Sequence, residues 1–176
     1  VSNAVSQFGG NFMTAFNPPL TKSFAAEGMS ANTYNFTVRV TKMTILLMSI
    51  IAFPLILNIS DILNIWLTEV PQYTAAICVI AILYVTIDII TSPLYILAYA
   101  DGNVKMYSIV LSIIQLFYVI IFYVACKLGA NPVQALSFNI LCALAQHIGR
   151  LVILKNIMNF EVIRYCKDTV LPYAIP

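Results

Sequence analysis

Four long apolar runs dominate the chain and predict membrane-spanning helices. The runs are 43–60, 70–100, 106–126 and 128–149. Each is uncharged except the second, which contains Asp88. About 20 apolar residues are needed to cross roughly 30 Å of hydrocarbon, and a segment in lipid must pair its own backbone groups. The runs are therefore expected to be helices, with kinks at Pro54 and Pro93.

A fifth helix is predicted over residues 1–26, although this segment is more polar. Asn3, Gln7, Asn11 and Thr14 recur at helical spacing and form one polar stripe, here called the α-helical polar stripe. Phe8 and Phe12 are among the apolar residues on its other faces. Such a helix fits between lipid or protein on one side and a water-filled cavity on the other, and an ordinary soluble amphipathic helix is the alternative.

The pattern thus predicts an all-α, polytopic transmembrane bundle of about five spanning helices in residues 1–155. The expected helices are about 1–26, 42–60, 73–99, 105–127 and 132–155. Residues 156–176 mix apolar and basic side chains, which predicts either a cytoplasmic amphipathic helix or a plain linker, leading to a further span. We expect both ends of the sequence to be cuts in a longer chain.

The basic residues predict the orientation of these helices. If the five helices alternate, eight basic residues fall on one side of the membrane and only Lys127 falls on the other. The eight are Lys22, Arg39, Lys42, Lys105, Arg150, Lys155, Arg164 and Lys167. Short cytoplasmic loops are enriched in Lys and Arg, so the side with eight is expected to face the cytoplasm.

Composition supports the membrane class and argues against several functions. The chain is 61% hydrophobic and 9% charged, against about 25% charged in soluble domains. Its net charge of +2 gives no reason to expect a nucleic-acid partner. The four cysteines lack paired metal-ligand spacing, and no nucleophile or phosphate-binding motif is present. We therefore expect no enzyme activity, no metal and no cofactor.

Asp88 is the strongest candidate for a functional residue. A charge at the centre of a span costs about 2.5–3.5 kcal/mol on insertion scales, and the sequence shows no obvious deep cationic partner. Asp88 is expected to be protonated, to pair with a cation on a neighbouring helix, to relay protons, or to form a structural hydrogen bond. His147 and Arg150, near the inner end of the last span, are candidate head-group contacts. Gln115 and Asn139 are expected to join helices.

Nearly the whole chain resembles a known family of transporters. The resemblance is carried by the stretches VSQFGGNFMTAFNPPLTKSFAAEG, ILNIWLTEVPQYT, IDIITSPLYILAYADGNVKMYSIV and RYCKDTVLP. Together these stretches resemble the multidrug/oligosaccharidyl-lipid/polysaccharide (MOP) flippase superfamily, nearest to the Wzx-like polysaccharide transporters of bacteria. Members have twelve to fourteen spans in two similar lobes around a central cavity.

The resemblance implies a fragment of the second lobe of a MATE-like transporter in the bacterial inner membrane. It also implies a polyprenyl-pyrophosphate-linked oligosaccharide as cargo, for O-antigen, lipopolysaccharide or capsule biosynthesis, with the bilayer and the missing first lobe as partners. The polar stripe and Asp88 are then cavity positions. The alternatives are a MATE-type drug/cation antiporter, a glycan-assembly membrane protein and a non-transporting scaffold.

Overall fold

The computed structural model describes residues 2–102 and 104–174, and this part of the chain is helical throughout, with short connections. The helices are α1 (Ser2–Glu27), α2 (Ala31–Leu57), α3 (Ile59–Trp66), α4 (Thr74–Ile90), α5 (Ser92–Ala100), α6 (Val104–Lys127), α7 (Pro132–Met158) and α8 (Val162–Ala174). Val1 and residues 175–176, at the ends of the predicted segments, lie outside the described residues. Helices α2, α6 and α7 and the α4–α5 pair are each long and apolar enough to cross a membrane. The chain is an all-α membrane helix bundle, as its hydropathy predicts.

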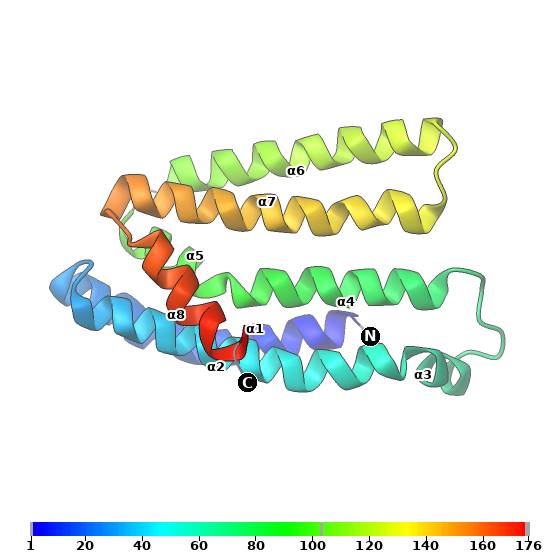
Figure 1. Cartoon of the computed structure of the whole chain (residues 1–176), viewed down its shortest axis with the longest axis horizontal. Helices are drawn as coiled ribbons and strands as arrows, with labels where there is room; N and C mark the ends of the chain where they lie inside the picture. The colour runs from blue at the N-terminus through cyan, green and yellow to red at the C-terminus, as the bar shows by residue number, and fades with distance from the viewer. Residues whose placement is uncertain (1, 103, 175–176) are drawn as a thin grey trace.

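The long helices lie side by side, and their connections alternate between the two ends of the bundle (Figure 1). The α1–α2, α5–α6 and α7–α8 turns lie at one end, while α3 and the α6–α7 turn lie at the other. Helix α4 packs against α1, α2 and α7, and α6 packs chiefly on α7. The connections therefore alternate in the way that the charge count assumes.

Helix α1 is long but too polar to join the four apolar spans. It packs against α2, α4 and α5, and it buries Val5, Met13 and Leu20. A Cβ atom added to Gly9 would stand 2.4 Å from Cδ1 of Ile89 on α4. Gly9 therefore permits the close approach of α1 and α4, as small residues do between membrane helices.

Helix α2 begins at Ala31, well before the predicted start at residue 42. Ser30 caps the helix, because its hydroxyl accepts a hydrogen bond of 3.2 Å from the backbone N–H of Thr33. Arg39 and Lys42 interrupt the apolar run, so hydropathy alone misses the first three turns. Helix α2 stops at Leu57, within one turn of the predicted end at about residue 60, and α3 follows.

The predicted helix 73–99 is divided into α4 and α5 at Thr91. Pro93 has no backbone N–H to donate to the carbonyl of Ile89, so regular helical bonding cannot continue through this point. The backbone N–H of Thr91 still reaches the carbonyl of Ile87, at 3.2 Å. The two helices therefore remain one continuous span with a local break.

Helix α8 is attached to α2, so the linker alternative for this segment is excluded. The hydroxyl of Tyr34 donates to Oδ2 of Asp168 at 3.0 Å, and the hydroxyls of Thr41 and Tyr165 are 2.9 Å apart. Phe160, at the start of this segment, stacks on both tyrosine rings. Tyr165 is 2% exposed, and its burial raises its pKa.

Candidate functional site

Asp88 of α4 and Arg150 of α7 form an ion pair between two spans. Nη2 of Arg150 lies 2.8 Å from Oδ1 of Asp88. The Arg150 side chain is only 10% exposed, whereas that of Asp88 is 49% exposed. The expectation that Asp88 has no deep cationic partner is therefore wrong. Of the four outcomes left open for Asp88, the structure shows pairing with a cation on a neighbouring helix.

Arg150 also holds the break between α4 and α5. Its Nη1 donates to the hydroxyl of Thr91, and that hydroxyl donates to the backbone carbonyl of Asp88 at 2.8 Å. One guanidinium thus contacts a carboxylate in the last turn of α4 and a hydroxyl at the break itself. Arginine suits this position because its planar fork presents five N–H donors and stays charged.

The ion pair lies at a depth where charge is costly. The span Thr74–Ala100 has 27 residues, which corresponds to about 40 Å at 1.5 Å per residue, and Asp88 lies near its middle. Arg150 lies eight residues before the end of α7 at Met158, or about 12 Å along the axis. Mutual neutralisation lowers the cost of placing both charges there. The half-exposed carboxylate remains open to a ligand.

A second polar contact joins α7 to α6. Nε2 of Gln146 donates to Oε1 of Gln115 at 2.8 Å, and Sγ of Cys142 lies 3.7 Å from the same oxygen. The expectation that Gln115 joins two helices is confirmed. Oδ1 of Asn139 is buried and has no hydrogen-bond partner within the described residues, so the same expectation for Asn139 is not met.

His147 and Arg150 were both expected to contact a substrate head group. Arg150 uses its guanidinium on Asp88 and Thr91, and only its buried Nε has no partner in the described part of the chain. A head-group contact by Arg150 therefore requires the ion pair to open. Nδ1 of His147, one turn away, is also buried without a partner there, and its role stays a prediction. Sequence reasoning missed Thr91, whose only signal was its place just before Ser92 and Pro93.

The α-helical polar stripe lies on the exposed face of α1. All four of its residues, Asn3, Gln7, Asn11 and Thr14, are exposed, and the Thr14 hydroxyl donates to the Gly10 carbonyl at 2.9 Å. The opposite face of α1 presents Gly9 to Ile89, the neighbour of Asp88 on α4. No hydrogen bond or ion pair among the described residues joins the stripe to Asp88. The stripe and the ion pair therefore form two separate polar surfaces.

Comparison of the chain with protein-family models, with curated protein sequences and with solved structures finds no match. The family resemblance therefore rests on the four sequence stretches alone. The described structure itself establishes a multi-pass membrane helix bundle with an ion pair between two of its spans.

Proposed function

We propose that this chain is part of a bacterial inner-membrane transporter that moves a polyprenyl-pyrophosphate-linked oligosaccharide across the bilayer for surface polysaccharide biosynthesis. The resemblance to Wzx-like flippases supports the cargo class. The observation that carries the proposal is the polar stripe on the exposed face of α1, a helix that packs against two spans of a membrane bundle, α2 and the α4–α5 pair. In this proposal, the first lobe of the full protein supplies the opposite wall of the cavity.

The chemistry of the stripe suits a sugar. Amide groups donate and accept hydrogen bonds, and a threonine hydroxyl does both, as sugar hydroxyls do. Exposing these groups to hydrocarbon leaves them unpaired, which is unfavourable, so the stripe is best placed against water or another polar surface. None of the four side chains carries a charge, and a neutral polar wall allows a large sugar to pass without binding it tightly.

The antiporter alternative receives less support from the charged residues. Binding a coupling cation calls for a cluster of carboxylates, and no group of three acidic, histidine or cysteine residues suited to a cation lies within the described residues. Asp88 itself is paired with Arg150. We therefore place Asp88 and Arg150 in the proposal as the tie that holds α7 against the α4–α5 break.

The proposal is tested in the full-length transporter, in a strain that lacks its own copy. Replacing Gln7 and Asn11 by Leu removes the central amides of the stripe while keeping helix propensity. We expect surface polysaccharide to fall at least tenfold and lipid-linked oligosaccharide to accumulate in the cytoplasmic leaflet. Both are measured by extraction and glycan staining at matched membrane levels.

The matched control replaces two residues that are also exposed but apolar, Ile113→Leu and Phe117→Leu on α6. This control variant should export normally. Normal export by the Gln7→Leu/Asn11→Leu variant would contradict the proposal. Loss of drug resistance with intact glycan export would favour the antiporter instead, and a full-length protein of only about five spans would favour a scaffold.

A further inference from the structure

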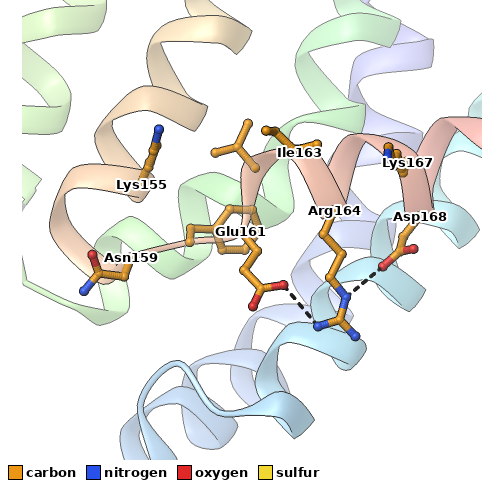
Figure 2. A pocket seen from close by; sticks show the side chains of 9 residues that line it. Lys155, Asn159, Glu161, Ile163, Arg164, Lys167 and Asp168 are labelled. Atoms are coloured by element: carbon orange, nitrogen blue, oxygen red, sulfur yellow. Dashed lines mark hydrogen bonds and ion pairs between the residues drawn. The ribbon is translucent and has the colours of Figure 1, made fainter.

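The turn between α7 and α8 carries a cavity with two chemically different sides. The cavity has a volume of about 620 Å³ and is lined by residues 155, 159–164, 167 and 168. Figure 2 shows Glu161, Arg164 and Asp168 in one row, with Lys155 and Ile163 on the other side of the turn. The two sides present different charges.

On the first side, one cation lies between two carboxylates, so the row has a net charge of −1. Nη1 of Arg164 lies 3.1 Å from Oε2 of Glu161, and its Nε lies 3.6 Å from Oδ2 of Asp168. The guanidinium also lies over the ring of Tyr34, 4.8 Å from its centroid. The hydrogen bond to Glu161 raises the pKa of Arg164 above its ordinary value. This row fastens α8 to α2 through Tyr34, and it offers no free cation to an anionic ligand.

The second side keeps its positive charge. Lys155 and Lys167 are exposed, and neither has an ion pair or hydrogen bond within the described residues. Ile163, also on this wall, is 75% exposed. Two unpaired amines beside an exposed branched apolar side chain match an anionic group that is attached to hydrocarbon.

The depth of Lys155 fits the same ligand. Helix α7 has 27 residues, about 40 Å, which exceeds the roughly 30 Å hydrocarbon core by about three to four residues at each end. Lys155 lies in the last turn, so its amine reaches the level of the lipid phosphates. A cavity of this size also falls within the range of small-molecule sites.

We propose that the wall formed by Lys155, Ile163 and Lys167 binds an anionic phospholipid, with the lysine amines attracting its phosphate and Ile163 contacting its acyl chain. Each lysine near an anionic surface favours such lipid about fivefold, so the pair predicts a preference for phosphatidylglycerol over phosphatidylcholine of roughly 25-fold. The proposal is independent of the cargo, and it makes the α7–α8 turn a lipid-anchored point of the bundle.

The test uses the whole chain reconstituted in phosphatidylcholine bilayers. The single tryptophan, Trp66, lies in α3 at the opposite end of the bundle, and it is replaced by Phe. Ile163→Trp then places the reporter on the proposed site. Phosphatidylglycerol brominated on its acyl chains should quench this tryptophan at roughly 25-fold lower mole fraction than brominated phosphatidylcholine. Lys155→Gln/Lys167→Gln should abolish that preference.

The matched control removes two other lysines from the same end of the bundle, Lys22→Gln/Lys105→Gln, which are also exposed and unpaired among the described residues. This variant should keep the preference. Loss of the preference in the control would show a general surface charge and overturn the site. Equal quenching by both lipids, or none by either, would overturn it too. Suppression of the preference by millimolar inorganic phosphate would assign the wall to free phosphate instead.

Discussion

At the residue scale, the Asp88–Arg150 pair shows what the sequence could and could not predict. Asp88 was identified correctly as unusual, because an intramembrane carboxylate is costly and demands a partner. Arg150 was assigned to the positively charged end of the bundle because it lies near the end of an apolar run. The two residues are 62 positions apart, and only the packing of α4 on α7 brings them together. Hydropathy along one chain contains no information about such a contact.

The pair predicts a specific coupling in stability. Asp88→Asn leaves a nine-tenths-buried guanidinium without its counter-charge, so we expect a loss of about 1–3 kcal/mol in the free energy of unfolding. Arg150→Gln should cost a similar amount. The double variant should lose clearly less than the sum, because neither charge then remains unpaired. Thermal unfolding of the full chain in detergent measures all three.

The exposed pair of Glu161 and Arg164 provides the comparison. Both side chains are about 60% exposed, so the same double-mutant cycle should give a much smaller coupling than the Asp88–Arg150 cycle. Additive losses at Asp88 and Arg150 would mean that the ion pair contributes nothing to stability. Normal glycan export by a folded Asp88→Asn variant would in addition remove its carboxylate charge from the transport mechanism.

At the element scale, the close contact between α1 and α4 depends on Gly9, which has no side chain. Gly9→Ala places a methyl group 2.4 Å from Cδ1 and 2.9 Å from Cγ2 of Ile89, so either the Ile89 side chain or the two helices must shift. Gly10, the next residue, has nothing within 4 Å of the same position. We expect Gly9→Ala to destabilise the bundle by about 1–3 kcal/mol, as overpacking does, and Gly10→Ala to be neutral or slightly stabilising. Equal unfolding temperatures for the two variants would contradict the packing.

If the polar stripe lines an aqueous cavity, its positions should be accessible to water-soluble reagents. Cysteines at Gln7 and Asn11, in a chain with its native cysteines replaced, should react with a membrane-impermeant maleimide. Cysteines at Ile113 and Leu116 should not, although these positions of α6 are also exposed from the bundle. The difference arises because thiols in hydrocarbon stay protonated and away from the reagent. Equal reactivity of the two sets would mean that the stripe does not face an aqueous cavity.

The hydropathy pattern predicts some helix boundaries correctly and misses others. The starts of α6 and α7 lie close to their predicted positions, because Val104 follows a turn and Pro132 suits the first turn of a helix. The early start of α2 was missed because charged residues lie on its first three turns. Buried threonines and contacts with α8 stabilise those turns. Such tertiary contacts override the helix boundary that the local hydropathy pattern predicts.

At the scale of the whole molecule, alternation of the connections was predictable because it follows from run length and charge. The arrangement of the helices around one another was not. Helix α4 lies between α1, α2 and α7, while α6 packs chiefly on α7 and leaves much of its apolar surface exposed. Helix α6 is the most apolar of the four spans and α7 the least, but hydropathy averaged along a helix does not say which of its surfaces face another helix and which face lipid or the rest of the protein.

The orientation in the membrane is the last prediction, and the chain contains a native reporter for it. Cys126 is exposed beside Lys127 at the end of α6, and the other native cysteines can be replaced by Ala. If the end that carries most of the basic residues is cytoplasmic, Cys126 should react with an impermeant maleimide added outside intact spheroplasts. A cysteine at Lys105, at the opposite end of the same helix, should react only after the membrane is opened. Because the two positions bound a single span, the reverse pattern would invert the orientation, and labelling of both from outside would mean that α6 does not cross the membrane.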